Sequence, residues 1–416
     1  MLSSHDNETL TRTNAGTQMG DLLRRFWLPV LLAQELPAPD CDPVRVHVCG
    51  EEYVAFRDTF GRVGLLDARC PHRLAELFWG RNEEAGLRCV YHGWKFDIDG
   101  TCLDLPSEPA ESNFKDKVRI GAYPAQEYGG LIWGYFGPPD QLPELPKLEF
   151  GHVPPEHLCV SKKLQECNWA QAVEGAIDTA HFSFLHMPKE VDDSSPQIVR
   201  WMKNDGSPRF TVIPHDAGFV IGGARTTESD DLYWRITQFL VPNHSLAPGS
   251  MAQDNMNGQT WVPIDDHHCW IYCYTWNPWR PITDTERALM GGGFGIHSEV
   301  DANWRPLRNR DNDYLIDRQA QRTTSFTGVR GISEQDAYIQ DSQGAIVDRT
   351  KEHLGTTDIA IIEWRKLMLK LARDLREGDE PPYVRRPEAY WLRSGGAVAP
   401  SSVPFADLVA ARTKVD

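Results

Sequence analysis

The sequence predicts an α+β chain in which a small antiparallel β domain precedes a larger domain, whose antiparallel sheet is flanked by helices. Short β-rich runs separated by turns, from residue 44 to residue 136, predict the first domain. Longer alternating runs between residues 211 and 276, bordered by helical segments, predict the second. A proline-rich stretch lies between them. We therefore expect three parts: an N-terminal helical segment that packs on the second domain (1–24), the first domain (25–150) and the second domain (151–416).

Composition and charge restrict the possible partners. The 416 residues are 41% apolar and 25% charged, as in soluble globular proteins, and the net charge is −16. This charge argues against nucleic acid and against an anionic membrane as partners. The apolar run after Arg24 and Arg25 is short and contains Pro29, so it predicts neither a secretory leader nor a membrane span. Seven of the nine cysteines show no paired spacing, which favours a reducing, cytoplasmic environment.

The other two cysteines belong to a metal-ligand motif in the first domain. Cys70-Pro71-His72 is followed, after sixteen residues, by Cys89-Val90-Tyr91-His92. Two thiolates and two imidazoles are the ligand set of a Rieske [2Fe-2S] centre. The alternative is a structural zinc site, but zinc motifs usually place both cysteines in one half, whereas here each half has one. Gly93 follows directly and predicts a tight turn near the cluster sulfurs.

A second constellation lies at the start of the second domain. Residues 168–185 have helical composition, with Pro188 as the stop. Asp178 and His181 would share a face of this helix, whereas His181 and His186 can meet at one metal only if the helix loosens between them. The alternative is that both histidines are core residues. Together with a carboxylate, they predict a mononuclear ferrous site with open positions for O2.

The order of these motifs resembles that of the Rieske non-haem iron oxygenases over nearly the whole chain. The segments Met19–Trp27, Asn168–Gln171 and Gln335-Asp336 are similar to the phthalate dioxygenase branch, which includes O-demethylases of lignin-derived aromatic acids. The resemblance implies a Rieske domain followed by a catalytic iron domain. It also implies that Asp336 is the third iron ligand, with Asp341 as its rival and an acidic helix start as the alternative for both.

The resemblance further implies an assembly and electron donors. We expect a head-to-tail homotrimer in which Asp178 bridges a cluster histidine and an iron histidine of neighbouring subunits. No flavin or nicotinamide motif is evident, because the glycine run 291–293 lacks a strand–turn–helix context. A separate reductase, with or without a ferredoxin, would therefore supply electrons. The alternatives are an electron-transfer Rieske protein and a zinc-bound interaction module.

The substrate implied by this branch is an aromatic carboxylate, either phthalate-like or methoxylated. The expected reaction is hydroxylation or O-demethylation with O2, and the residues do not separate the two. A carboxylate in an apolar pocket favours arginine as its partner. The candidates on the predicted sheet are Arg209, Arg225, Arg235 and His244, although each such residue is more often structural or on the surface. Residues 281–327 resist assignment.

Overall fold

The computed structural model describes residues 2–109, 111–249 and 254–415. The chain divides into two compact units, one formed by residues 23–143 and the other by residues 1–22 and 144–416. The boundaries expected from the sequence, after residues 24 and 150, lie close to these. None of the helices in the described ranges is long and apolar enough to cross a bilayer.

The unit of residues 23–143 contains three small antiparallel sheets, because its strands are short and are joined by tight turns. Gly50 and Gly61, at two of these turns, have φ of 78° and 81°, which glycine adopts without strain. The sheets are β1 (Trp27–Leu32), β10 (Leu131–Tyr135) and β9 (Ala125–Tyr128); β2 (Val44–Val48), β3 (Glu51–Arg57) and β4 (Val63–Asp67); and β5 (Arg81–Glu83), β6 (Gly86–Arg88), β7 (Lys95–Phe96) and β8 (Cys102–Asp104).

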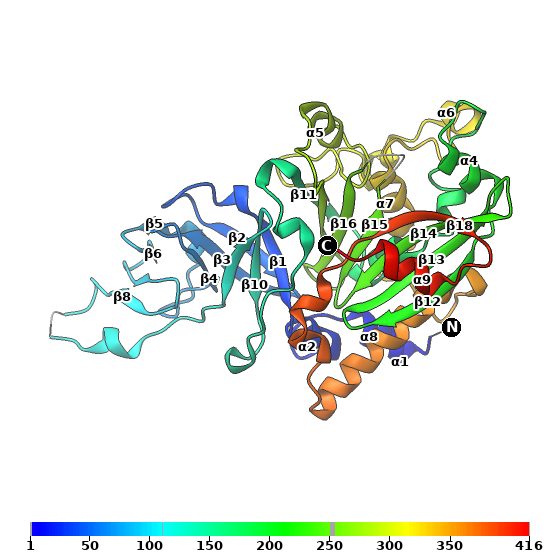
Figure 1. Ribbon diagram of the computed structural model, residues 1–416. Helices are drawn as coiled ribbons and strands as arrows, with labels where there is room; N and C mark the ends of the chain where they lie inside the picture. The colour runs from blue at the N-terminus through cyan, green and yellow to red at the C-terminus, as the bar shows by residue number, and fades with distance from the viewer. Residues whose placement is uncertain (1, 110, 250–253, 416) are drawn as a thin grey trace. The chain divides into compact units, whose positions relative to one another are not determined.

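The larger unit is organised around one eight-stranded sheet with antiparallel pairing between neighbouring strands (Figure 1). This agrees with the antiparallel sheet predicted from the alternating runs. The strand order is β11 (Leu158–Gln165), β17 (Cys269–Trp276), β16 (Met256–Pro263), β15 (His244–Pro248), β14 (Asp231–Leu240), β13 (Gly218–Thr226) and β12 (Arg209–His215), and β18 (Gly395–Pro400) also pairs with β14.

Helices pack on both faces of this sheet, because its side chains alternate between the faces. Phe239 of β14 packs edge-on against Trp364 of the long helix α8, whereas Trp234 of the same strand stacks on Phe405 of α9, in front of the strands in Figure 1. The helices are α1 (Ser4–Thr11), α2 (Gln18–Leu23), α3 (Trp169–Ile177), α4 (Gln197–Asn204), α5 (Asp284–Gly291), α6 (Arg318–Thr323), α7 (Ile332–Ser342), α8 (Ile359–Glu377) and α9 (Phe405–Arg412).

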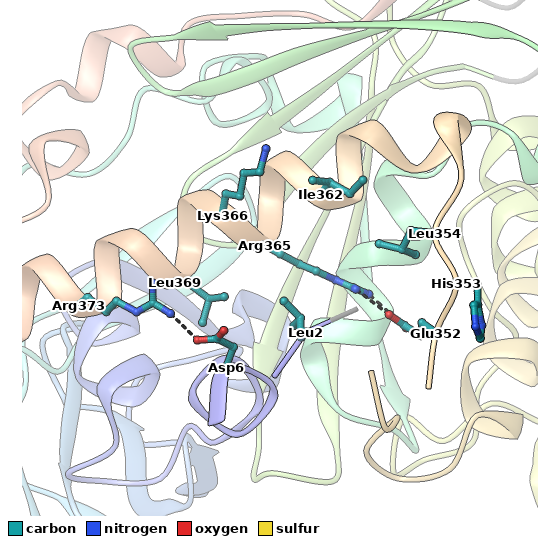
Figure 2. Close-up of a pocket in the computed structure, with 10 residues that line it drawn as sticks. All are labelled: Leu2, Asp6, Glu352, His353, Leu354, Ile362, Arg365, Lys366, Leu369 and Arg373. Carbon is teal, nitrogen blue, oxygen red and sulfur yellow. Dashed lines mark hydrogen bonds and ion pairs between the residues drawn. The ribbon is translucent and has the colours of Figure 1, made fainter. Parts of the chain in front are cut away.

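The N-terminal helix α1 packs against α8 and α3 of this unit. Residues of α1, α8 and the segment before α8 line a cavity of about 680 Å³. Figure 2 shows that Asp6 of α1 pairs there with Arg373 of α8. Arg365 in the same cavity pairs with Glu352 at 2.6 Å and with the buried Glu174 of α3 at 2.6 Å. Since these charges satisfy one another, the ion pairs join α1, α3 and α8.

Helix α8 begins directly after a 3-10 turn at Thr356–Asp358, and it buries Trp364. The single helix expected over residues 168–185 is wrong, because α3 ends at Ile177 and a separate 3-10 turn covers His181–Ser183. The unassigned segment 281–327 contains α5, α6 and a 3-10 segment, and its three glycines at 291–293 form the end of α5.

Candidate metal centres and substrate pocket

The four residues of the first motif lie close together within the 23–143 unit. Cys70 and Cys89 are 1% and 3% exposed and belong to the unit's apolar core. A hydrogen bond from the Cys70 thiol lowers the pKa of Cys89 to about 6, so the two sulfur atoms lie side by side. The Cys89 loop turns at Gly93, whose φ is 79° and where a Cβ would lie 2.5 Å from Pro106. The expectation of a tight turn at Gly93 is confirmed.

The two histidines of this motif also face each other. The rings of His72 and His92 are 4.4 Å apart, and His72 stacks on Trp94 at 4.3 Å. Nδ1 of His92 is buried and has no hydrogen-bond partner in the described parts of the chain. An orphaned ring nitrogen beside two adjacent sulfurs fits a metal ligand. The stacking of Trp94, which the sequence does not reveal, holds the His72 ring in place.

The second centre forms where α3 ends. Asp178 caps the helix, and its Oδ1 accepts a hydrogen bond from the backbone N–H of Ala180, which turns the chain out of the helix. His181 then lies in a 3-10 turn, and the following loop brings His186 back towards it. Two histidines five residues apart point in different directions on a continuous helix. The break in the helix therefore allows His181 and His186 to approach the same site.

Asp336 of α7 completes a group of three possible metal ligands. Nε2 of His181 and Nε2 of His186 are 3.0 Å apart, and Oδ1 of Asp336 lies 3.5 and 3.2 Å from them. Ligands at about 2.1 Å and at right angles would be about 3 Å apart, so the spacing fits one face of an octahedral ion. The rival Asp341 instead accepts hydrogen bonds from Gln165 and Tyr314.

Two neighbours set the ring orientation of the histidines. Oε1 of Gln335 lies 2.8 Å from Nδ1 of His186, and Oδ2 of Asp178 lies 3.4 Å from Nδ1 of His181. Each acceptor favours a proton on Nδ1, which leaves the Nε2 lone pair for a metal. Burial raises the pKa of Asp336, but the neighbouring rings of His186 and His181 lower it by more, so the pKa of Asp336 lies below its usual value.

A cavity of about 360 Å³ opens beside the three ligands. Its lining is mainly apolar, which suits an aromatic ring. The polar residues that the sheet contributes to this lining include Arg235 of β14, and Asn257 and Gln259 of β16. The apolar lining includes Phe182, Met187, Ile198, Val199, Met202, Phe294, Ile296 and Ile332. Phe294 and Ile296 come from the segment that resisted assignment, so part of that segment forms a pocket wall.

The four substrate-binding candidates lie in different places, and the structure brings only Arg235 into the pocket. Register pairs Arg209 with Ala224 and His244 with Leu240, which places both on the α9 face of the sheet, away from the pocket.

Their local surroundings explain this result. Arg209 is exposed, and Nδ1 of the buried His244 bonds to Thr260 Oγ1. Arg225 shares the pocket face with Arg235 but is fully buried, and it donates to Thr179 O at 2.9 Å and to Ser183 Oγ at 3.3 Å. The prediction that Arg209, Arg225 and His244 bind substrate is therefore not supported, because two have other partners and one faces solvent.

Comparisons with known proteins agree with this geometry. Residues 26–124 match the Rieske [2Fe-2S] domain and residues 134–405 the LigXa C-terminal domain like family. The oxygenase subunit of phthalate 4,5-dioxygenase from Pseudomonas putida is 41% identical over 396 residues, covering 91% of this chain and 88% of that protein. The oxygenase subunit of 5,5'-dehydrodivanillate O-demethylase from a Sphingobium strain is 31% identical, covering 94% and 85%.

A similar fold occurs in a solved structure. The mutant NdmA of Pseudomonas putida CBB5 with caffeine has a TM-score of 0.61 at 18% identity, and the match covers 93% of this chain and 100% of that one. The predicted cofactors, a Rieske [2Fe-2S] cluster and a mononuclear iron, are those of such oxygenases. The chain therefore belongs to the Rieske non-haem iron aromatic oxygenases, as an oxygenase subunit of the phthalate dioxygenase branch.

Proposed function

We propose that His181, His186 and Asp336 hold the mononuclear ferrous iron and that the chain oxidises an aromatic carboxylate bound beside them. The observation that carries this proposal is the convergence of three ligand atoms, within 3.5 Å of one another, at an apolar cavity containing Arg235. Cys70, His72, Cys89 and His92 would hold the [2Fe-2S] cluster. Iron bound at the triad would supply O2 activation and one electron.

Arg235 is the residue best placed to hold the substrate carboxylate. Its side chain is 6% exposed, and its Nε has no hydrogen-bond partner in the described residues. Its guanidinium lies over the Phe182 ring at 4.0 Å, which fixes its orientation. Burial lowers the pKa of Arg235, yet guanidinium remains protonated at neutral pH. A carboxylate would satisfy the unpaired donor and neutralise this charge, with the ring in the apolar lining.

The position of the substrate in this cavity would select the reaction. If a ring carbon lies nearest the iron, the ring is hydroxylated; if a methoxy carbon lies there, the methyl group is removed. The two relatives named above, one a phthalate dioxygenase and one an O-demethylase, support both outcomes for this branch. The pocket residues of this chain bind and orient the ring, and their apolar side chains exclude water from it.

The electron supply and assembly form part of the same proposal. A separate reductase, with or without a ferredoxin, would reduce the cluster. In a homotrimer, Asp178 would accept a hydrogen bond from His181 of its own subunit and from a cluster histidine of the next subunit. Its hydrogen bonds to His181 and to backbone N–H groups hold the pKa of Asp178 below its usual value despite burial, which suits an acceptor. The nine cysteines are all free, which supports a cytoplasmic location.

Iron content and product formation test the proposal. Purified holoenzyme should contain about three irons per chain, two of them with a Rieske spectrum. His181→Ala should lose about one iron and all product formation while keeping that spectrum. His244→Ala is the matched control, since His244 is also a buried histidine but faces away from the cavity. Turnover of a panel of aromatic acids with and without methoxy groups, fed by a surrogate reductase, identifies the reaction. Unchanged turnover in His181→Ala would contradict the proposal.

A further inference from the structure

A chain of hydrogen bonds runs from the pocket into the interior of the larger unit. Asn257 of β16 lines the pocket, and its Oδ1 lies 2.6 Å from Oγ1 of Thr275 on β17. Oγ1 of Thr275 lies 2.9 Å from Nε2 of His297, whose Nδ1 lies 2.7 Å from Oγ of Ser161 on β11. Asn257 and Thr275 are direct cross-strand partners, so the sheet register maintains this contact.

The distances assign the direction of each hydrogen bond. The 2.6 Å contact between Thr275 and Asn257 is typical of O–H···O, and N–H···O bonds are longer. Thr275 therefore donates to Asn257 and accepts from Nε2–H of His297, at a distance typical of N–H···O. Ser161 then donates to the remaining Nδ1 of the ring. In this arrangement the tautomer of His297 determines which group donates and which accepts in every hydrogen bond between Asn257 and Ser161.

His297 can hold this pattern because it stays neutral. It is 2% exposed, and burial lowers its pKa to about 4, well below the pH of the cell. A neutral ring has one donor and one acceptor nitrogen, and both are used. The amide of Asn257, a residue that lines the pocket, consequently presents its carbonyl oxygen to Thr275, which leaves its –NH2 for another partner. This –NH2 has no acceptor among the described residues, so it is available to a ligand.

We propose that Asn257 is a substrate-specificity residue that donates a hydrogen bond to an acceptor group on the substrate, and that Thr275 and His297 are its positioning residues. The ligand class is an aromatic acid that carries, besides the carboxylate held by Arg235, a second substituent with an acceptor oxygen, such as a carbonyl, an ether or a further carboxylate. The inference rests on the proposed function, because Arg235 orients the ring. A ligand without the second acceptor leaves the –NH2 of Asn257 unpaired in the filled pocket. Because of this lost hydrogen bond, such a ligand binds more weakly than one that carries the acceptor.

Matched ligands isolate this hydrogen bond. Dissociation constants are measured by titration calorimetry on the anaerobic holoenzyme with ortho-, meta- and para-acetylbenzoate and the corresponding isopropylbenzoates, which have similar shape but no acceptor. The wild type should bind the acetyl compound at least tenfold more tightly at one ring position. Asn257→Asp still accepts from Thr275 but offers no donor to the pocket, so this ratio should fall at least tenfold. The Rieske spectrum and circular dichroism confirm that each variant is folded.

Variants of Thr275 test the positioning role independently. Thr275→Val has the same shape and removes both hydrogen bonds, so it should lower the acetyl-to-isopropyl ratio several-fold. Thr275→Ser keeps the hydroxyl and should retain the wild-type ratio. His297→Leu should behave like Thr275→Val. Either of two results would overturn the inference: no acetyl preference in the wild type, or an unchanged acetyl-to-isopropyl ratio in Asn257→Asp, including the case in which both ligands lose affinity equally.

The same data separate this inference from the proposed function. Arg235→Met should weaken benzoate, acetylbenzoate and isopropylbenzoate by a similar factor, because all three contain the carboxylate. Unchanged benzoate affinity in Arg235→Met would contradict the carboxylate site alone. The acetyl-to-isopropyl ratio would still report on Asn257, since it compares two ligands that differ only in the acceptor.

Discussion

Replacing Gln335 by leucine should weaken iron binding without touching a ligand. The Gln335 amide connects the iron site to the loop before α7: its Oε1 accepts from Nδ1 of His186 at 2.8 Å, and its Nε2 donates to Val329 O at 2.7 Å. Leucine has a similar volume but neither group. The Nδ1–H of His186 then loses its acceptor, and the ring is free to rotate or to change tautomer.

The magnitude follows from the lost hydrogen bonds. A buried group left without a partner costs about 1–3 kcal/mol, and losing the acceptor of a ligand histidine weakens metal affinity about 10–100-fold. These values agree, because each tenfold change corresponds to about 1.4 kcal/mol. We expect the ferrous dissociation constant of Gln335→Leu to rise by about 10–100-fold.

The assay removes the mononuclear iron with a chelator and titrates Fe(II) back anaerobically in competition with a coloured chelator. The Rieske absorption serves as an internal standard for protein concentration and cluster integrity. Gln335→Glu is the control, since it keeps an acceptor for His186 but loses the donor to Val329; its affinity should stay within about threefold of the wild type. Wild-type affinity in Gln335→Leu would refute the reasoning, and equal weakening in both variants would assign the effect to the Val329 contact.

Three further predictions concern other parts of the larger unit. Arg225→Met should lower iron retention several-fold, as measured by metal analysis after dialysis. The benzoate dissociation constant of the iron-loaded protein should not change. A selective loss of benzoate binding would instead indicate that Arg225 binds the substrate carboxylate. In Glu286→Gln the bidentate ion pair with Arg280 is lost, and with it about 1 kcal/mol of unfolding free energy at pH 7. Because the hydrogen bond from Arg280 lowers the pKa of Glu286, this contribution is complete above the unfolded value of about 4.3 and disappears as the pH falls through the folded value, so urea unfolding of the two proteins should converge in acid. Gly222→Ala should destabilise by about 1–3 kcal/mol in the same urea assay, because the new Cβ would lie 2.4 Å from the Phe405 ring; wild-type stability would show that α9 moves without cost.

Local spacing carried the information about metal chemistry. Cysteine and histidine ligands within one loop are close in space wherever the loop lies, so Cys70-x-His72 and Cys89-x2-His92 predict a four-ligand site before any fold is known. Alternating residues predict strands for the same reason, since side-chain direction depends only on the local backbone. The outline of two β-rich parts therefore follows from local patterns.

The face of the sheet on which each side chain lies could be assigned only from the register of the strands. Arg209 and Arg235 are both strand arginines in the sequence, yet pairing with Ala224 and Gly223 places them on opposite faces. Arg225 lies on the correct face but is covered by the turn at Thr179 and Ser183. The two-residue alternation of strand side chains does not indicate which face of the sheet a given loop covers. It therefore cannot identify which arginine lies in the pocket.

The sequence by itself determined the ligand types, the division into a Rieske part and a catalytic part, and the family. Tertiary structure alone decided that Gln335 orients His186 and that His297 reaches Asn257 through Thr275. These contacts join residues from 18 to 149 positions apart in the chain. Their hydrogen bonds depend on three-dimensional distance and direction, for which neither spacing nor composition contains a signal.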